Sequence, residues 1–467
     1  MGKEQLIVVG GVAAGLAAAM QARRHAPDLS ITVMEKTGDI SYGACGLPYV
    51  VSGLIPQLDH LILHTPAYFR ERHRIDVQLH AEVVEILPAR SLARVSVAGA
   101  RRDLSFDSLV LATGAAAVCP PLAGRDLAGV FVLRQLHDGR RLLAFIEQER
   151  PRAAVIVGAG YIGLEMAEAL RARGLAITIV ESSDRVMSTL GGLLRERVVE
   201  ELRGRGVEVV LGERVAAFEG LGGRVAGVVT ESGRAFEAQV VLIGVGVRPN
   251  AALAKDAGLE TGESGAIITD ANQRTSASNV FAAGDCCETL HRVSGRRVWM
   301  PLAQPAIRQG WVAGANAAGA TPEMRYAGLV GTNAIKVFDL EVGRTGLSLE
   351  EAREAGFDAA AVDDESPTRA GYYPGGAKIL TRLVSDKSGR LLGAQMVGRE
   401  GVAHRIDVYA AALHANLKLE EINSLDLAYA PPFAPTIDPI LRATKQKDVN
   451  RESSIVNRRK LFFSIDD

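Results

Sequence analysis

One cysteine and two acidic residues stand where their chemistry would serve a redox protein, the cysteine by reacting with sulfur and the acids by binding nucleotides. Cys45 lies in the segment SYGACGLPY at residues 41–49, and no second cysteine follows it closely. A lone thiol of this kind must cycle through a mixed disulfide, a persulfide or a sulfenic acid. Glu35 and Glu181 each end an apolar run about twenty residues after a glycine-rich turn, where an acid can accept from a ribose hydroxyl. These residue types and spacings predict a redox protein that binds two dinucleotides.

The first glycine turn follows directly on an apolar run near the start of the chain. The run LIVV at residues 6–9 is typical of a buried parallel strand, and a helix-favouring stretch follows the turn GGVAAG. The start of that helix would point free amide groups at a pyrophosphate. Gly10 and Gly15 match the dinucleotide fingerprint, whereas Val12 replaces its middle glycine. Together with Glu35, this pattern predicts the first dinucleotide site.

The second glycine turn completes the same fingerprint. Its glycines are Gly158, Gly160 and Gly163. The turn follows the apolar run AAVIV at residues 153–157 and precedes a helix-favouring stretch at 164–172. The charge of Glu181 favours the free 2′-hydroxyl of NADH and repels the 2′-phosphate of NADPH. NADH is therefore the nucleotide expected here, with NADPH less favoured.

Two later motifs indicate that the first site holds a flavin. Thr113 and Gly114 form a small-residue turn after the strand-like run at 106–111, and Asp285 ends another apolar run. Asp285 is suited to bind the hydroxyls of a ribityl chain. Gly246 lies where the chain is expected to return from the second nucleotide unit to the first. FAD is therefore the cofactor predicted for the first site.

The residues around Cys45 affect its chemistry, because the thiolate and not the thiol is the nucleophile. Residues 46–52 favour the start of a helix, with Pro48 in its first turn. A helix N-terminus stabilises negative charge, so the sequence predicts a lowered pKa for Cys45. Ser41, at the start of the same segment, is expected to contact the cofactor.

Composition and charge exclude several other classes of protein. At 467 residues the chain exceeds one ordinary hydrophobic core, so several domains are expected. A net charge of −1 gives no reason to expect nucleic acid, and no apolar run reaches the length of about 20 residues that spans a membrane. Four cysteines are too few for a disulfide scaffold, and no pattern predicts a metal site. A reduced, cytoplasmic compartment is expected.

The segment around Cys45 resembles the active-site segment of a known group of enzymes. These are the coenzyme A-disulfide reductases and the NAD(P)H-dependent persulfide or polysulfide reductases, which are single-cysteine pyridine nucleotide-disulfide oxidoreductases. The likeness runs from about residue 5 to about residue 440. The related NADH oxidases and peroxidases carry a Ser-Cys-Gly-Met pattern and are the weaker match. Further motifs that carry the likeness lie at 65–66, 112–114, 331–332, 336–339, 372–374 and 427–433.

This resemblance implies an α/β fold with two dinucleotide-binding, Rossmann-like domains, one for FAD and one for NAD, and a C-terminal α+β dimerisation domain. It also implies a homodimer in which Tyr429, and either Tyr372 or Tyr373, reach Cys45 of the partner subunit. A phenol there could give a proton to a departing thiolate. The expected domains are 1–118 with 251–325 for FAD, 119–250 for NAD(P)H and 326–445 for dimerisation, followed by a divergent tail at 446–467.

The resemblance also bears on the substrate, because this chain departs from the members that reduce coenzyme A disulfide. Three of their coenzyme A contacts match here, whereas four positions carry a different residue from the polar or cationic one that those members tend to have. Such losses weaken binding of a phosphorylated nucleotide, although Arg308 could compensate for part of them. Coenzyme A disulfide is therefore expected to be a poor substrate. The matching residues are Gln21, Arg24 and Ser41, and the departures are Ala44, His73, Ile307 and Ile437.

The sequence therefore favours a cytoplasmic, homodimeric FAD enzyme that oxidises NADH and reduces a small sulfur substrate through Cys45. The acceptor would be a disulfide, a persulfide or a polysulfide. One alternative is an NADH oxidase or peroxidase in which Cys45 cycles through a sulfenic acid. A second is a flavin-bearing redox sensor that changes a protein contact, which the polar, basic residues at 446–467 suggest. No membrane or nucleic-acid partner is expected in any of these cases.

Overall fold

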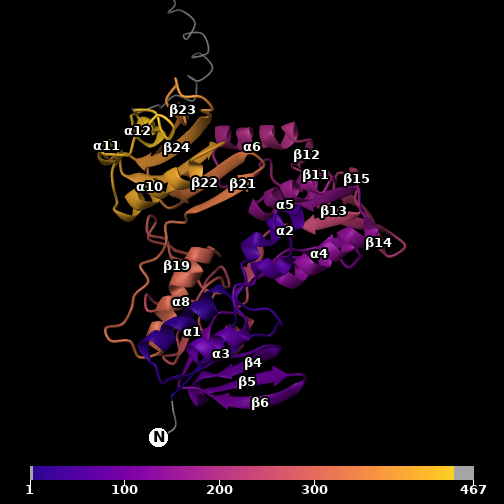
Figure 1. The fold of residues 1–467 in the computed structure, drawn as a ribbon, viewed down its shortest axis with the longest axis vertical. Coiled ribbons are helices and arrows are strands. Elements are labelled where there is room, and N and C mark those ends of the chain that lie inside the picture. The colour runs from indigo at the N-terminus through magenta and orange to yellow at the C-terminus, as the bar shows by residue number, and fades with distance from the viewer. Residues whose placement is uncertain (1–3, 446–467) are drawn as a thin grey trace, which may run out of the picture. The chain divides into compact units, whose positions relative to one another are not determined.

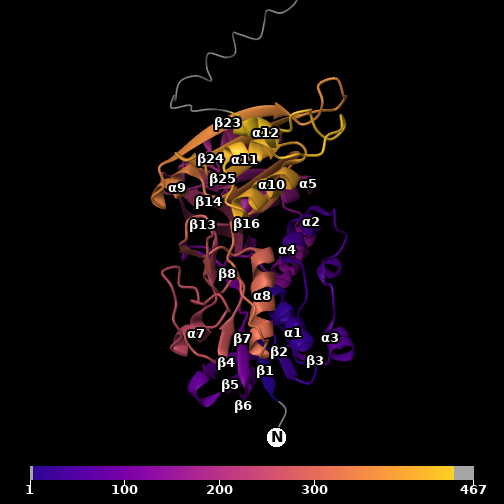
Figure 2. The same ribbon diagram turned by 90° about the vertical axis from the view of Figure 1, so that its left-hand side faces the viewer.

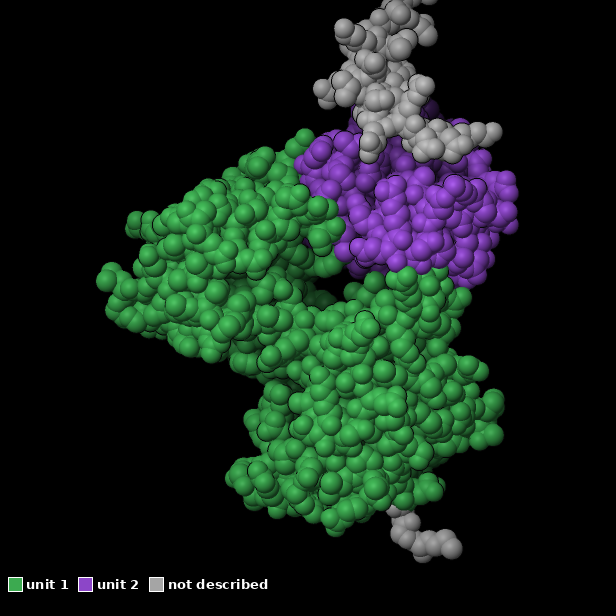
Figure 3. Space-filling view, turned by 180° about the vertical axis from the view of Figure 1, so that it is seen from behind, with its two compact units in different colours: residues 1–188, 199–329 green, residues 189–198, 330–467 purple. Residues whose placement is uncertain are grey.

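The computed structural model describes residues 4–445, which form two compact units (Figure 3). The first unit runs to Ser188 and continues from Val199 to Leu329. The second contains the short segment Thr189–Val198 and the described residues from Val330 onward. The tail predicted at 446–467 lies outside the described residues.

A five-stranded parallel sheet forms the core of the first nucleotide-binding part of unit 1 (Figure 1). Its elements are β1 (Gln5–Val9), α1 (Ala13–His25), β2 (Ser30–Met34), α3 (Pro66–His73), β3 (Ile75–Gln78), β4 (Ala81–Leu87), β5 (Leu92–Val97), β6 (Ala100–Ser105), β7 (Ser108–Leu111), β18 (Val280–Ala282) and α8 (Ala303–Ala317). The strand order is β18-β7-β1-β2-β3, so β1 lies at the centre. Helices α1 and α8 cover one face, and the antiparallel sheet β4-β5-β6 covers the other. This burial on both faces explains the continuous apolar run of β1.

A second five-stranded parallel sheet belongs to the same unit. Its elements are β9 (Val130–Phe131), α4 (Leu136–Glu149), β10 (Ala153–Val157), α5 (Tyr161–Ala172), β11 (Ala176–Glu181), α6 (Gly192–Gly204), β12 (Val207–Leu211), β13 (Val215–Leu221), β14 (Arg224–Thr230), β15 (Ala235–Glu237) and β16 (Val240–Ile243). The strand order is β12-β11-β10-β16-β9, and the antiparallel sheet β13-β14-β15 shares its apolar core. The chain returns through β17 (Val247–Pro249), which pairs with β8 (Ala115–Ala117). The returning segment also holds α7 (Ala252–Asp256), β19 (Thr289–Leu290) and β20 (Arg297–Val298).

The second unit is built on a five-stranded antiparallel sheet. Its elements are β21 (Asn333–Val337), β22 (Leu340–Gly346), α9 (Leu349–Glu354), β23 (Ala359–Pro367), β24 (Lys378–Asp386), β25 (Leu391–Gly398), α10 (Val402–His414), α11 (Leu419–Asn423) and α12 (Pro439–Thr444). Helix α10 packs against β22 and β25. The predicted fold class, two nucleotide-binding α/β parts and a C-terminal α+β part, is confirmed. The limits of the FAD and NAD(P)H domains, at 118–119 and 250–251, stay predictions.

Both helices that follow the glycine turns begin inside the turn. The sequence predicted helices at 16–24 and 164–172, whereas α1 begins at Ala13 and α5 at Tyr161. Amides of the turn therefore join the first helical turn, where they have no acceptor within the helix. They remain available to bind a phosphate.

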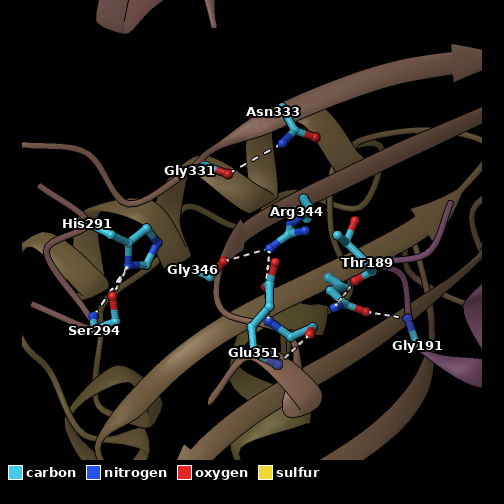
Figure 4. Close-up of polar contacts among 11 residues, drawn as sticks. Thr189, Gly191, His291, Ser294, Gly331, Asn333, Arg344, Gly346 and Glu351 are labelled. Carbon is cyan, nitrogen blue, oxygen red and sulfur yellow. Dashed lines mark hydrogen bonds and ion pairs between the residues drawn. The ribbon is translucent and has the colours of Figure 1, made fainter. Parts of the chain in front are cut away.

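A buried arginine stabilises the sheet of the second unit (Figure 4). Arg344 on β22 is 6% exposed, and its guanidinium donates to the Glu351 carboxylate at 2.7 Å.

Gln395 on β25 accepts the Gly191 N–H at 2.7 Å and donates to the Thr189 carbonyl at 2.9 Å. These two bonds explain why a short segment that ends within α6 belongs to this unit.

Two glycines let α8 lie directly against α1 (Figure 2). A Cβ atom on Gly310 would lie 2.3 Å from the Ala14 carbonyl oxygen, and one on Gly314 would lie 2.0 Å from the Ala18 carbonyl oxygen. Successive turns of one helix meet successive turns of the other, so the two helices run parallel. This contact sets the position of α1, whose first turn belongs to the first nucleotide site.

The variant Gly314→Ala is expected to lower the free energy of unfolding by roughly 1–3 kcal/mol, because the added methyl group overlaps the backbone of α1. Gly204→Ala is the matched control, since a Cβ on this helical glycine meets no atom within 4 Å. That control should be neutral or stabilising by up to about 1 kcal/mol. Chemical denaturation of both variants measures the difference, and equal stabilities would contradict the close helix contact.

All four cysteines are free thiols. Among residues 4–445, no helix is long and apolar enough to cross a membrane. The same residues contain no group of three or more His, Cys, Asp or Glu side chains placed to hold a metal ion.

Candidate active site

The first glycine turn lies beside the acid that the spacing predicted. Gly10 has a φ of +114°, and a Cβ atom there would lie 2.2 Å from the Ala112 carbonyl oxygen, so only glycine fits. Glu35 is 7% exposed, and one of its carboxylate oxygens accepts the Gly11 N–H at 2.8 Å. The other oxygen accepts from the N–H and the hydroxyl of Thr37, both at 2.8 Å. The carboxylate is thus held firmly at the edge of the turn.

The second glycine turn is built in the same way. One oxygen of Glu181 accepts the Ala159 N–H at 2.7 Å, and the other accepts the Ser183 N–H at 2.8 Å. A Cβ atom on Gly160 would meet no atom within 4 Å, so nothing in the described protein covers the turn there. An uncovered turn at the N-terminus of a helix fits a pyrophosphate.

In both turns the last glycine lets the helix lie against the first glycine. A Cβ atom on Gly15 would lie 1.9 Å from the Gly10 carbonyl oxygen, and one on Gly163 would lie 2.1 Å from the Gly158 carbonyl oxygen. Close packing of helix on strand is the role of this glycine in dinucleotide folds. The residues present therefore fit two dinucleotides, one at each turn.

Thr113 and Gly114 join the segment that returns from the second sheet. The Thr113 hydroxyl donates to the Asn250 carbonyl at 2.6 Å, and the Asn250 amide donates back to the Thr113 carbonyl at 2.9 Å. Gly246 has a φ of +111° and accepts the Val118 N–H at 3.0 Å. A Cβ atom on Gly114 would meet no atom within 4 Å, so this turn is also uncovered. The two connections between the nucleotide-binding parts thus lie side by side.

Asp285 has a partner that the sequence did not predict. Its carboxylate accepts a hydrogen bond from the guanidinium of Arg134, and the Asp285 side chain is 16% exposed. The Asp285 carbonyl also accepts from Nε1 of Trp299 at 2.8 Å. The Asp138 carboxylate accepts the backbone N–H of Arg134 at 2.9 Å and so fixes the backbone of this arginine. This ion pair lies close enough to Cys45 for both charges to act on its pKa.

Cys45 lies on the 3₁₀ turn η1 (Ala44–Gly46), directly before α2 (Leu47–Ser52), and it is exposed. Pro48 lies in the first turn of α2, as predicted. The predicted direction of the pKa shift is wrong. Although the residue reaches solvent, partial burial raises the pKa of the Cys45 thiol, and the charge of Glu165 raises it further. Helix α2 has only six residues, whereas burial disfavours the charged form of the thiol.

Glu165 is a residue of this site that the sequence analysis missed. It lies on α5, two residues after the last glycine of the second turn, and it is half-buried. Burial, and then the neighbouring Glu168, raise the pKa of Glu165 to about 7. Burial and the charge of Glu165 also raise the pKa of Tyr49 on α2. A carboxylate among the buried apolar residues of α5 is the signal that could have pointed to it.

The residues predicted to bind the substrate do not all lie together. Gln21 and Arg24 are neighbours on the last turns of α1, and the Arg24 guanidinium donates to the Gln21 side chain at 3.3 Å. Burial, and then the nearby His64 and Arg24, lower the pKa of His73 at the end of α3. Nε2 of His73 is buried and has no hydrogen-bond partner among the described residues. His73 is therefore close to Arg24 but uncharged at neutral pH.

Ser41 and Arg308 lie on other elements than these three residues. The Ser41 N–H donates to the Gly11 carbonyl at 3.0 Å, so Ser41 lies beside the first glycine turn. Arg308 lies on α8, and its charge acts on Tyr326, two residues after Met324, whose sulfur accepts from the Gln21 amide at 3.8 Å. Gln21 and Arg24 occupy the last turns of α1. Of the predicted substrate residues, Arg24 and His73 are thus near each other, and Ser41 lies at the first glycine turn.

Two of the three predicted tyrosines form a hydrogen-bonded pair on the second unit. The hydroxyls of Tyr372 and Tyr429 lie 3.1 Å apart, whereas Tyr373 does not join them. The hydrogen bond from Tyr372, and then one from Thr436, lower the pKa of Tyr429. The same bond raises the pKa of Tyr372. Tyr372 and Tyr429 are 76% and 46% exposed, so both phenols are accessible on this chain.

Comparison with known proteins identifies the family. Residues 4–310 match the family described as pyridine nucleotide-disulphide oxidoreductase, and residues 332–439 match its dimerisation domain. The chain belongs to the pyridine nucleotide-disulphide oxidoreductase family. FAD and NAD(P)H are the cofactors of this family, and the two glycine turns fit them. The resemblance predicted from the segment around Cys45 is confirmed at the level of the family.

Three similar proteins illustrate the range of relatives. An NAD(P)H sulfur oxidoreductase (CoA-dependent) from Pyrococcus abyssi is 40% identical, over 94% of this chain and 97% of its own. An NADH oxidase from Methanocaldococcus jannaschii is 35% identical, with the same two coverages. The solved structure of an NAD-dependent persulfide reductase from A. fulgidus has a TM-score of 0.92 and 38% identity, over 94% of this chain and 82% of that one.

Proposed function

We propose that this protein reduces a small disulfide, persulfide or polysulfide with electrons from NADH, and that Cys45 reacts with the sulfur acceptor. The observation that carries the proposal is an exposed, unpaired cysteine in the same unit as two dinucleotide turns. Cys286 and Cys287 are 0% and 4% exposed, so neither meets a substrate as readily. The four free thiols support a cytoplasmic location.

Cys45 acts as the nucleophile. Its thiolate attacks one sulfur of the acceptor and forms a mixed disulfide or persulfide, while the other sulfur leaves as a thiolate or sulfide anion. Bound FAD supplies the two electrons from NADH that cleave this bond and restore the thiolate. The charge of Arg134 lowers the pKa of Cys45 and so opposes the effects of burial and of Glu165. Arg134 thus favours the thiolate form of Cys45.

The two turns would hold the two cofactors through equivalent residues. Gly10, Gly15 and Glu35 would bind the pyrophosphate and adenosine ribose of FAD. The carboxylate of Asp285, already oriented by Arg134, would face the ribityl hydroxyls. The second turn and Glu181 would hold NADH in the same way, with the acid on the 2′-hydroxyl.

We further propose a homodimer in which the Tyr372–Tyr429 pair meets Cys45 of the partner subunit. The match to a dimerisation domain supports the assembly, and the exposure of both phenols supports the contact. Because the bond from Tyr372 lowers the pKa of Tyr429, Tyr429 is the better proton donor to a departing thiolate. Tyr372 would then support Tyr429, and Tyr373 would pack nearby.

An anaerobic screen of NADH oxidation tests the proposed function. The arms are polysulfide, glutathione disulfide, coenzyme A disulfide, coenzyme A persulfide and peroxide, with an aerobic arm for oxygen. Steady turnover with a sulfur acceptor, and only slow turnover with oxygen or peroxide, is the expected result. Turnover confined to oxygen or peroxide would replace the proposal with an NADH oxidase or peroxidase, the activity named for the relative from M. jannaschii.

The variant Glu181→Ala is expected to narrow the preference for NADH over NADPH by roughly tenfold, because it removes a negative charge that would face the 2′-phosphate. Adding Ser182→Arg should narrow it further, since Ser182 is exposed beside this acid. Steady-state kcat/KM values for both nucleotides measure the effect. Glu147→Gln, an exposed acid on α4, is the charge control. A higher kcat/KM for NADPH in the unaltered enzyme would show that the role of Glu181 is wrong.

A further inference from the structure

Helix α5 connects the second glycine turn to the helix that follows Cys45. Glu165, Ala169 and Arg173 recur every four residues, so they share one side of the α5 segment. This side faces α2, because Nε of Arg173 donates to the Val51 carbonyl at 2.6 Å and Nη2 donates to the Val50 carbonyl at 3.5 Å. The last carbonyls of a helix have no partner within the helix, so Arg173 holds the end of α2. α2 and α5 are therefore fixed side by side.

Glu165 faces the start of the Cys45 segment from this position. Its charge acts on both Cys45 and Tyr49, which lie one turn apart at the start of α2. Among residues 4–445, no cation and no hydrogen-bond donor meets its carboxylate, and its one charged neighbour is Glu168. Strand β10 carries no titratable side chain, and Glu181 on β11 is bonded to the second turn. An ionised Glu165 and a Cys45 thiolate therefore repel each other. The other two charges that act on Cys45 are Arg134, which favours the thiolate, and Asp285, which opposes it, and these two are paired with each other.

We propose that Glu165 and Cys45 share one negative charge, so that Glu165 takes up a proton when Cys45 becomes a thiolate and releases it when Cys45 is bonded to sulfur. The proposal rests on the function given above for Cys45. When Cys45 is in a mixed disulfide it is neutral, and Glu165 can ionise. Two electrons then cleave the disulfide to the Cys45 thiolate and a departing thiolate. One proton goes from solvent to the Glu165 carboxylate, and Tyr429 of the partner subunit protonates the departing thiolate. Glu165 is thus a positioning residue for charge, and it does not touch the acceptor.

The test is the pH dependence of Cys45 alkylation by iodoacetamide in the reduced holoenzyme. A Cys119→Ser background removes the other exposed thiol. Rates from about pH 5 to about pH 10 cover the ordinary range of carboxyl and thiol ionisation. In the parent protein the plot of alkylation rate against pH should show two steps, one from the Glu165 carboxyl and one from the Cys45 thiol. Glu165→Gln is expected to remove the carboxyl step and to shift the thiol step to lower pH, with a several-fold faster alkylation rate at neutral pH. Glu165→Asp keeps the charge and should keep both steps. Glu147→Gln should match the parent protein, because Glu147 is exposed on α4.

A second measurement keeps the proposal testable if Glu165→Gln binds FAD poorly. Proton uptake during two-electron reduction near neutral pH, followed with an indicator dye, should be larger in the parent protein than in Glu165→Gln. Identical alkylation profiles and identical proton uptake would overturn the inference. Failure of the proposed function is distinguishable, because sulfur-acceptor turnover in Cys45→Ser would overturn the role of Cys45 whatever the alkylation profiles show.

Discussion

Cys45→Ser is expected to retain FAD and its reduction by NADH, and to lose roughly a thousandfold or more in the rate of sulfur-acceptor reduction. The reason is the place of Cys45 in the proposed electron path, after the flavin and before the acceptor. A serine hydroxyl fits the same space but is not ionised at neutral pH, and it cannot form a disulfide. Anaerobic stopped-flow absorbance separates the two half-reactions in one experiment.

Cys119→Ser is the matched control for this substitution. Cys119 is the other exposed cysteine, and it lies in a loop beside two prolines. Its replacement should leave both half-reactions unchanged. Full acceptor turnover in Cys45→Ser would move the chemistry to Cys286, to Cys287 or to the flavin itself. Because Cys286 and Cys287 are buried, such turnover is not expected from them, and observing it would contradict the role of Cys45.

Coenzyme A disulfide is expected to have a kcat/KM about a hundredfold or more below that of polysulfide or a small disulfide. A charge-assisted contact contributes roughly 1.5–3 kcal/mol where it is desolvated, so two lost contacts account for this factor. The structure supports the loss in two ways. His73, which stands at the position of a cationic family residue, is kept neutral by burial and by nearby positive charge. Ile437 is 44% exposed and has no polar group to offer a phosphate.

His73→Lys tests the same explanation in the opposite direction. A lysine there would restore a cation beside Arg24 and should raise kcat/KM for coenzyme A disulfide by roughly tenfold. The value for polysulfide should not change. His404→Lys adds a cation to an exposed position of the second unit and serves as the control. If the parent enzyme prefers coenzyme A disulfide to polysulfide, other residues compensate for the departures and the prediction is wrong.

The nucleotide turns could be predicted from the residue pattern because their requirements are local. Gly10 and Gly158 need a positive φ within a few residues of a strand, and both acids follow at the spacing of one strand–helix–strand unit. The fold class follows from the same local pattern repeated twice. The pairing of these turns with Cys45 and the likeness to a family of known fold then predicted the oxidoreductase class.

The surroundings of the thiol could not be predicted in this way. Arg134 and Asp285 are 151 residues apart, and Arg173 and Val51 are 122 residues apart, so no spacing in the chain announces either contact. The predicted pKa shift of Cys45 was wrong for the same reason. A helix N-terminus is a local feature that the sequence shows, whereas burial and the charge of a distant glutamate are not.

The choice between two adjacent tyrosines shows the same limit. Tyr372 and Tyr373 are equivalent candidates in the sequence, but the hydroxyl of Tyr372 meets that of Tyr429, 57 residues away. The amino-acid pattern thus sufficed for the cofactor turns and the class of chemistry, because bonded neighbours create those features. Packing alone decided which charges act on the thiol and which tyrosine pairs with Tyr429, because electrostatic and hydrogen-bond energies depend on distances through space.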